Sequence, residues 1–247
     1  MKVILALPIY NEQDGIPLLL ESFIQVMGTD NVLVVAVNDG SDDNTDKVLC
    51  DWYRKVPMSM VIHFENMGLG ATIEDALRCA AAVASSSDDV IVTMDADNTH
   101  SPMLIPEMVR RIESGDDIVI ASRYCADSLV VGLSAFRTAM SIGAAAVLGW
   151  LCPIPGVRDY TCGFRAYRAG LLQQVFKGAY GDSLITESGF TCMAEILLKL
   201  SRLDPQISEV PMTLRYDRKH SKSKMRPWVT AFRTLRLAVR FAWRRSK

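Results

Sequence analysis

The stretch "DVIVTMDADNTH", residues 89–100, ends an apolar run with two aspartates one residue apart. Residues two apart in an extended strand point to the same side, so Asp95 and Asp97 address one point, with the small Ala96 between them. A buried ionised carboxylate is costly unless it is paired, hydrogen-bonded or bound to a metal. Magnesium typically binds one or two protein carboxylates together with phosphate oxygens. The stretch therefore predicts a strand that ends at a metal site for a nucleotide diphosphate.

Similar apolar runs alternate with helical patterns through the first 125 residues. Such Val/Ile/Leu-rich strands, separated by helices, are typical of a mostly parallel sheet that is covered on both faces, a Rossmann-like α/β fold. Polar residues collect where the predicted strands end, and this edge of a parallel sheet is where ligands bind. We predict strands at 2–10, 31–39, 58–65, 89–97 and 117–124, and helices at 14–28, 41–56, 70–85 and 102–114.

The composition of the 247-residue chain, with 49% hydrophobic and 22% charged residues, allows a sizeable core. Six cysteines without any C-x-x-C pair argue against a zinc site or a disulfide framework and suit a reducing cytosol. The apolar run in "MKVILALPIYNE" (1–12) is too short for a signal peptide and is expected to form the first strand.

The end of the chain is basic. Residues 218–247 hold 11 of the 27 Lys and Arg residues and none of the 28 Asp and Glu residues. From residue 226 on, large apolar residues recur every three or four positions with arginines opposite, which predicts a basic amphipathic helix on an anionic membrane surface. The alternative is a helix packed on the domain with its arginines in water. No motif for nucleic-acid binding accompanies it. The apolar residues are Trp228, Phe232, Leu235, Val239 and Trp243.

A second uncharged stretch, "AMSIGAAAVLGWLCPI" (139–154), has 16 residues. A spanning helix needs about 20 apolar residues, so we expect this one not to cross a membrane. It is interpreted as a buried core helix, with a helix in the membrane interface as the other reading.

Taken in order, the motifs of the chain resemble family 2 glycosyltransferases of GT-A fold, in the dolichol-phosphate mannose synthase-like (polyprenyl-phosphate glycosyltransferase) branch. The resemblance covers nearly all of residues 1–225 and implies a nucleotide-sugar-binding half (1–125), an acceptor-binding half (126–225) and a separate C-terminal helix (226–247). The matching segments are "LPIYNE" (7–12), "VNDGSDDNT" (37–45), "NMGLGAT" (66–72), "MDADNTHSP" (94–102), "IVIASRY" (118–124), "DYTCGFRAYR" (159–168), "ESGF" (187–190), "EILLKL" (195–200) and "SEVPMTLRYDRKHSKSK" (208–224).

The resemblance implies an inverting, metal-dependent transferase that moves a sugar from GDP-mannose or a UDP-sugar to a polyprenyl or dolichyl phosphate. The enzyme is expected in the cytoplasm, peripherally bound to the inner membrane face, and the sequence predicts nothing about oligomeric state. The implied metal ligands for Mg²⁺ or Mn²⁺ are Asp95, Asp97 and Thr99; the nucleotide contacts are Pro8, Tyr10, Glu12, Asp39 and Ala96; the phosphate-binding residues are Arg123, Arg137, Arg218, Lys222 and Lys224; and the catalytic set is Asp97, Arg123, Arg137 and Arg218.

Other functions stay open at this stage. The same fold can transfer to a hydroxyl group on a glycolipid, glycan or natural product, which needs a base such as Glu187 or Asp182. A nucleotidyltransferase is disfavoured because "PIYNEQDG" (8–15) stands where that class has a glycine-rich basic loop. A dinucleotide oxidoreductase is disfavoured because this chain has no G-x-G-x-x-G after its first predicted strand. A catalytically inactive membrane-docking module is a further alternative. His100 beside the aspartates is expected to have a structural or supporting role.

Overall fold

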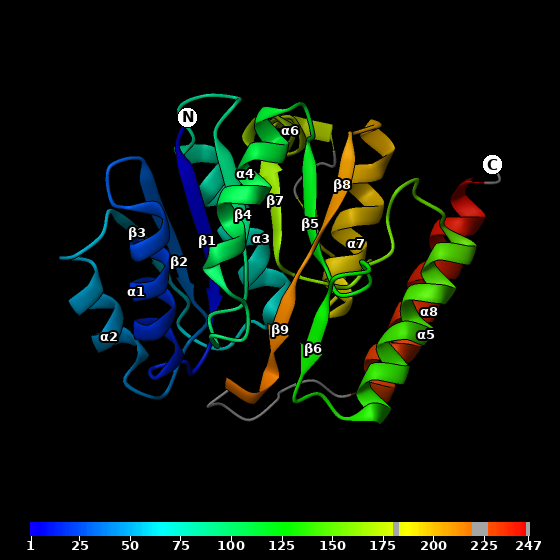
Figure 1. Ribbon diagram of the computed structural model, residues 1–247, viewed down its shortest axis with the longest axis horizontal. Coiled ribbons are helices and arrows are strands. Elements are labelled where there is room, and N and C mark those ends of the chain that lie inside the picture. Colours follow the sequence, from blue (N-terminus) through cyan, green and yellow to red (C-terminus); the bar gives the residue numbers. More distant parts are fainter. Residues whose placement is uncertain (180–182, 219–226, 246–247) are drawn as a thin grey trace.

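In the computed structural model, which describes residues 1–179, 183–218 and 227–245, seven strands form one central sheet in the order β3-β2-β1-β4-β7-β5-β8 (Figure 1). All pairings in this sheet are parallel except those of β7, which runs antiparallel between β4 and β5. The mostly parallel sheet is therefore confirmed. The strands are β1 (Val3–Ile9), β2 (Val32–Asn38), β3 (Met58–Ile62), β4 (Val90–Thr93), β5 (Ile118–Ser122), β7 (Arg165–Arg168) and β8 (Ile207–Pro211).

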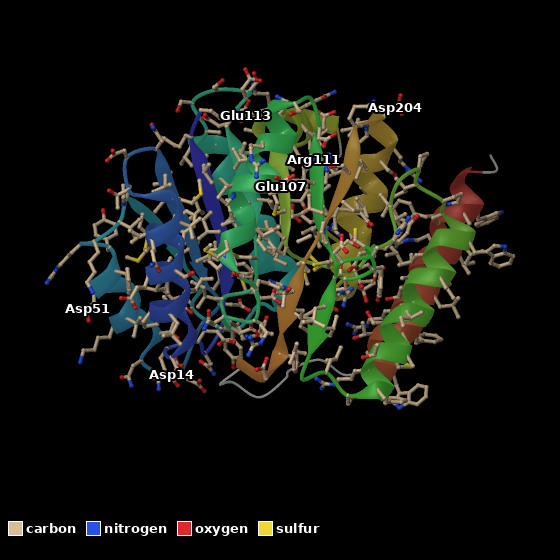
Figure 2. The ribbon with its side chains drawn as sticks, viewed as in Figure 1. Asp14, Asp51, Glu107, Arg111, Glu113 and Asp204 are labelled. Carbon is tan, nitrogen blue, oxygen red and sulfur yellow. The ribbon has the colours of Figure 1, made fainter. Side chains whose placement is uncertain are left out.

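Helices cover both faces of the sheet, with α1 and α4 on one side and α3 and α6 on the other (Figure 1). The strands beneath them are almost fully buried, as their near-continuous apolar sequence predicts. Charged side chains such as Asp51, Glu113 and Asp204 stand on the outer surface (Figure 2). The helices of this part are α1 (Gly15–Met27), α2 (Thr45–Trp52), α3 (Leu69–Val83), α4 (Ile105–Glu113), α6 (Ala169–Gln174) and α7 (Thr191–Leu200), with short turns η1 (Pro102–Leu104), η2 (Val175–Ala179), η3 (Ser201–Leu203) and η4 (Tyr216–Arg218).

A small second sheet and a pair of helices lie outside the central sheet (Figure 1). Strands β6 (Leu129–Val131) and β9 (Thr213–Arg215) form a small parallel sheet, and α5 (Ala135–Leu151) runs beside α8 (Pro227–Arg245) along one side of the molecule (Figure 1). The interpretation of 139–154 as a buried core helix is wrong, because only Ala145 and Leu148 of α5 are buried. Within the described ranges, no helix is long and apolar enough to cross a membrane.

Helix α8 lies where the sequence predicts a C-terminal helix, and it packs against α5 and α7. Thr234, Leu237, Ala238 and Phe241 are buried against the rest of the protein. The large apolar side chains predicted to form one face point outward instead, and Trp228 is 71% exposed. Helix α8 thus packs on the domain, as the alternative predicts, with Arg233 and Arg236 exposed and Arg240 partly buried.

Candidate active site

A pocket of about 570 Å³ opens at the carboxyl ends of β1, β2 and β4, where α5 and α8 close its far side. Every residue predicted for the metal, nucleotide or phosphate whose side chain the structure describes lines this pocket, whereas the candidate base Glu187 does not. Arg218 ends η4, but its side chain lies outside the described part, as do Asp182, Lys222 and Lys224 entirely. The predicted residues in the lining are Pro8, Tyr10, Glu12, Asp39, Asp95, Ala96, Asp97, Thr99, Arg123 and Arg137.

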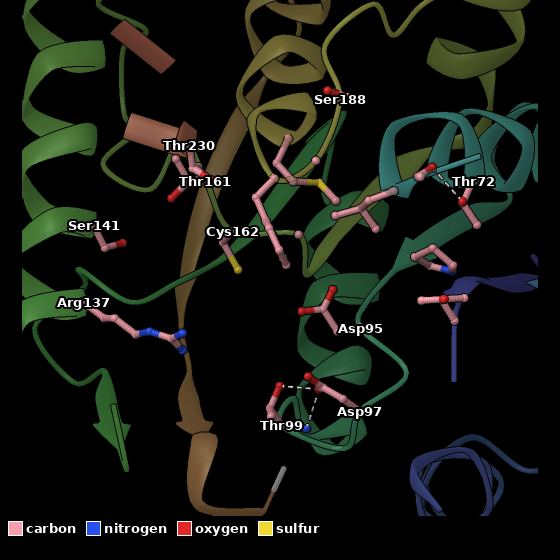
Figure 3. A pocket seen from close by; sticks show the side chains of 18 of the residues that line it. Thr72, Asp95, Asp97, Thr99, Arg137, Ser141, Thr161, Cys162, Ser188 and Thr230 are labelled. Atoms are coloured by element: carbon pink, nitrogen blue, oxygen red, sulfur yellow. Dashed lines mark hydrogen bonds between the residues drawn. The ribbon is translucent and has the colours of Figure 1, made fainter. Parts of the chain in front are cut away.

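The two aspartates of the opening motif follow β4 directly and both reach into the pocket (Figure 3). Asp97 is buried, and its Oδ1 accepts hydrogen bonds from the Thr99 backbone N–H (3.1 Å) and the Thr99 hydroxyl (2.6 Å). A left-handed residue between them, Asn98 with φ 61°, turns the chain back to allow this. Thr99 thus orients Asp97 in this structure.

The carboxylate pair fits a divalent cation that is shared with a substrate. Among the described residues, no group of three or more His, Cys, Asp or Glu side chains could hold a metal by itself. Magnesium and manganese accept this arrangement, because phosphate oxygens and water complete their coordination. His100 supports the same turn: its Nδ1 accepts the Asp95 backbone N–H (3.3 Å), and its ring stacks on Phe164.

Asp39, at the end of β2, is held by contacts that the sequence analysis missed. Its carboxylate accepts the backbone N–H groups of Met67 (2.8 Å) and Gly68 (2.9 Å) at the start of α3. His63 lies between two carboxylates, with Nδ1 2.7 Å from Asp39 and Nε2 3.0 Å from Asp75. These contacts fix the Asp39 carboxylate at the edge of the pocket. No local pattern in the sequence joins His63 to Asp39, because they follow different strands.

Arg123 forms a buried two-point ion pair with Asp159, whose Oδ2 accepts Nε (2.7 Å) and whose Oδ1 accepts Nη2 (2.6 Å). Burial alone would raise the pKa of Asp159, but Arg123 and backbone N–H groups outweigh it and hold that pKa below its ordinary value. For Arg123, burial would lower the pKa, and the neighbouring Asp159 carboxylate raises it instead. Much of the Arg123 charge is thus balanced by Asp159 inside the protein. Asp159 is the first residue of the motif "DYTCGFR", but the sequence did not indicate that it pairs with Arg123.

Arg137 and Ser141 lie one turn apart on α5 and both line the pocket (Figure 3). Arg137 donates through Nη1 to the hydroxyl of Tyr216 (2.9 Å), and the Ser141 and Tyr124 hydroxyls are 2.7 Å apart. Ser134 caps the start of α5 by accepting the Arg137 backbone N–H. The exposed helix α5 therefore presents a cation and a hydroxyl to the pocket.

Residues 183–190, called here the 183–190 segment, form another wall of the pocket through Ser188, Gly189 and Phe190. Two carboxylates bind four consecutive backbone N–H groups of this segment. Glu74 of α3 accepts those of residues 184 and 185, and Glu195 of α7 accepts those of residues 186 and 187. Burial would raise the pKa of Glu195, but hydrogen bonds from Thr186 and Lys199 outweigh it and lower that pKa.

The C-terminal helix also contributes to the pocket, which the sequence analysis did not foresee. Val229, Thr230, Ala231, Arg233 and Thr234 of α8 all belong to the lining.

Glu187, the candidate base, is directed away from the pocket. Its carboxylate lies 3.2 Å from Arg240 Nη2, and it is not among the described residues that line the pocket.

The chain belongs to glycosyl transferase family 2, whose family model matches residues 5–176. With its mostly parallel sheet and the site at the strand ends, it has the GT-A fold, and the predicted enzyme class is confirmed.

Two relatives are named as polyprenyl-phosphate mannosyltransferases. A dolichol-phosphate mannosyltransferase of Pyrococcus furiosus is 30% identical over 86% of this chain, and an undecaprenyl-phosphate mannosyltransferase of Micrococcus luteus is 29% identical over 91%. The present chain spans 56% of the Pyrococcus protein's length and 88% of the Micrococcus protein's. The resemblance to this branch is thereby confirmed.

Solved structures share the fold at lower sequence identity. Glucosyl-3-phosphoglycerate synthase from Mycobacterium tuberculosis, solved with Mn²⁺, UDP-glucose and phosphoglyceric acid, is 18% identical with a TM-score of 0.67, over 98% of this chain and 79% of its own. TarS 1–349 of S. aureus is 17% identical with a TM-score of 0.61, over 98% of this chain and 65% of its own.

Proposed function

We propose that this protein is an inverting, metal-dependent glycosyltransferase that moves a sugar from a nucleotide-sugar, GDP-mannose or a UDP-sugar, to a polyprenyl phosphate at a membrane surface. The observation that carries the proposal is one continuous pocket. Asp95 and Asp97 stand at its strand-end side, and Arg137 approaches from α5 on the opposite side (Figure 3). The names of the two mannosyltransferase relatives support the same donor and acceptor classes.

On the donor side, Asp95 and Asp97 are the residues that would hold Mg²⁺ or Mn²⁺, with Thr99 keeping Asp97 in place. The bound cation supplies charge stabilisation to the leaving nucleotide diphosphate. The structural neighbour from Mycobacterium tuberculosis contains Mn²⁺ together with UDP-glucose, which supports a divalent cation in this fold. The nucleoside contacts proposed here are Pro8, Tyr10, Glu12, Asp39 and Ala96.

On the acceptor side, the chemistry needs cations more than it needs a base. A phosphate oxygen is already anionic at neutral pH, so the protein must bring two anions together. Arg137 presents its guanidinium to the pocket, and Arg123 lines the pocket while it is bonded to Asp159. Planar guanidinium groups bind phosphate through paired hydrogen bonds. In this proposal Arg218, Lys222 and Lys224 complete the phosphate-binding set.

The alternative acceptor is a hydroxyl group, which must lose a proton to Glu187 or Asp182. The Glu187 carboxylate is 3.2 Å from Arg240 Nη2 and does not belong to the described lining of the pocket. This pairing favours the phosphate acceptor.

The proposed membrane contact is the outer surface of α5 and α8. Phe136 and Trp150 of α5 are 50% and 82% exposed, and Trp228, Phe232 and Trp243 of α8 are each at least 67% exposed. Large exposed apolar patches mark interaction sites, and aromatic residues suit the interface between lipid headgroups and acyl chains. One such surface gives reversible attachment, which we propose takes place on the cytoplasmic face of the membrane.

The proposal keeps residues 1–225 as the transferase domain, with a donor half to residue 125, an acceptor half from residue 126 and the helix from residue 226 as the attachment element. Because β7 and β8 lie in the same sheet as β1, the two halves share one core.

The test uses purified protein, Mn²⁺, a panel of GDP- and UDP-sugars and a short polyprenyl phosphate. Lipid-linked sugar and free nucleotide are followed together, with Asp97→Ala as the control. Metal-dependent lipid product that the variant fails to make would support the proposal and identify the donor. Nucleotide release without lipid product would favour the hydroxyl acceptor. Neither product nor nucleotide binding with any donor would overturn the proposal.

A further inference from the structure

The 183–190 segment has no regular secondary structure, yet three of its residues line the pocket. Its geometry therefore depends on side chains of neighbouring helices. At its start, Glu74 of α3 and Glu195 of α7 bind its backbone N–H groups. The start of α3 also approaches it so closely that a Cβ at Gly70 would lie 2.5 Å from the Glu187 carbonyl oxygen.

The far end of the segment is held by α8. Arg233 donates through Nη1 to the Ser188 hydroxyl (2.5 Å), and Arg240 Nη2 lies 3.2 Å from Glu187 and 3.6 Å from Glu195. The Arg240 Nε is buried and has no hydrogen-bond partner among the described residues. Arginine heads ordinarily stay in water, so this inward position has a cost that the two glutamates offset.

A third arginine of α8 behaves differently. Arg236 is exposed, as Arg233 is, but its side chain makes no hydrogen bond or ion pair with any residue of the described ranges. The inward contacts are thus specific to Arg233 and Arg240 and are not a general property of a basic helix.

We infer that Arg233 and Arg240 are positioning residues: they hold the 183–190 segment, and with it one wall of the pocket, through Ser188 and Glu187. The inference rests on the proposed glycosyl transfer for its activity readout. It assigns α8 two faces, an outer apolar face for lipid and an inner one that shapes the site. The nucleoside end of the pocket, around Pro8 and Asp39, is built by β1 and β2 and does not depend on these arginines.

The experiment compares Arg233→Gln and Arg240→Gln with Arg236→Gln, which removes the same charge from the same helix. Transfer to a short, water-soluble polyprenyl phosphate is measured without vesicles, and nucleotide affinity is measured by calorimetry. We expect kcat/KM for the acceptor to fall roughly ten- to hundredfold in Arg240→Gln and less in Arg233→Gln, because small misplacements of binding groups reduce rate strongly. Nucleotide Kd should stay within about twofold, Arg236→Gln should match the wild type, and Arg240→Lys, which keeps the charge near Glu187, should recover part of the loss.

Hydrogen exchange of the segment gives a second test that needs no turnover. Backbone N–H groups of residues 184–187 should exchange faster in Arg240→Gln than in Arg236→Gln, while those of β1 stay unchanged. Equal exchange in the two variants would overturn the inference, as would wild-type turnover in Arg240→Gln. A joint loss of nucleotide affinity, Tm and turnover in Arg233→Gln would also overturn it, since the contact would then serve general stability. If the wild type transfers no sugar, the proposed function fails. Hydrogen exchange then still tests whether the arginines of α8 hold the 183–190 segment.

Discussion

The two sides of the pocket are held in place by different interactions. On the proposed donor side, Asp39, Asp95 and Asp97 follow strands whose backbones are hydrogen-bonded into the central sheet. On the proposed acceptor side, the lining comes from α5, α8 and the 183–190 segment, and charged side chains of α3, α7 and α8 hold that segment. Arg123 with Asp159, and Glu195 with Lys199, are pairs in which the carboxylate is fully buried.

This difference has an energetic consequence. A ligand carboxylate on the donor side can be neutralised with little structural change, because the sheet holds its backbone. Removing one partner of a buried ion pair on the acceptor side leaves an uncompensated charge and costs stability. We therefore expect donor-side substitutions to reduce activity, and acceptor-side substitutions to reduce stability or positioning.

The largest expected effect comes from Asp95→Asn on the donor side. Loss of one metal-binding charge should lower kcat about a thousandfold, since electrostatic stabilisation of the leaving group is the main task of the site. The midpoint of thermal unfolding should shift little. Parallel measurements of sugar transfer and calorimetric unfolding check both statements, and a strongly destabilised variant would contradict the comparison.

Asp159→Asn should produce the opposite outcome on the acceptor side, a free energy of unfolding lower by about 3 kcal/mol at pH 7. The folded pKa of Asp159 is lowered, so its contribution is present above the ordinary carboxyl pKa and is lost as pH falls through the folded value. The difference from the wild type should thus shrink below about pH 4. Urea unfolding at several pH values measures this.

The matched control for this substitution is Asp88→Asn. Asp88 pairs with Arg168 at the surface and its side chain is 71% exposed. We expect a change below about 0.5 kcal/mol. Equal losses in both variants would remove the distinction between the two kinds of ion pair.

A smaller effect is expected for the outer face of α8. Phe232→Ser should weaken binding to phosphatidylglycerol vesicles about tenfold, because burial of a phenyl group in an apolar phase contributes about 1.5–3 kcal/mol. The fold of the variant should be unaffected, since Phe232 is 69% exposed. Phe64→Ser is the control, because Phe64 is fully exposed after β3, far along the chain from α5 and α8. Vesicle sedimentation measures both, and unchanged binding in Phe232→Ser would argue against this lipid surface.

The smallest effect concerns the thiols. Burial raises the pKa of Cys162 and of Cys192 to about 12, so both stay protonated and unreactive at neutral pH although Cys162 lies at the pocket. Cys50 is exposed. Maleimide should label Cys50 in the native protein at pH 7.5 and reach Cys162 and Cys192 only after unfolding. Labelling of Cys50 should leave sugar transfer unchanged. Mass spectrometry of the peptides tests this, and rapid native labelling of Cys162 would show that the pocket wall opens.

Some elements were missed because their formation depends on distant residues. The predicted helix at 41–56 is shorter in the structure, Thr45–Trp52, because side chains of Ser41 and Asp43 hold the preceding turn against residues near Asn11. Strand β7, "RAYR" (165–168), is only four residues long and carries a fully buried arginine, so its pattern does not resemble a core strand. It forms because β4 and β5 lie on either side of it.

The sequence by itself determined the parallel sheet and the Asp95–Asp97 pair at its edge, because strand periodicity and the end of an apolar run are local properties. It also identified the family through its ordered motifs. Only the tertiary structure decided that Arg123 is paired with Asp159, that His63 supports Asp39 and that α8 brings Arg233 and Arg240 to the 183–190 segment. The physical reason is that an amphipathic helix specifies two faces but not their partners. Here, Glu187 and the buried Glu195 attract Arg240, Ser188 accepts a hydrogen bond from Arg233, and the aromatic side chains are left outside.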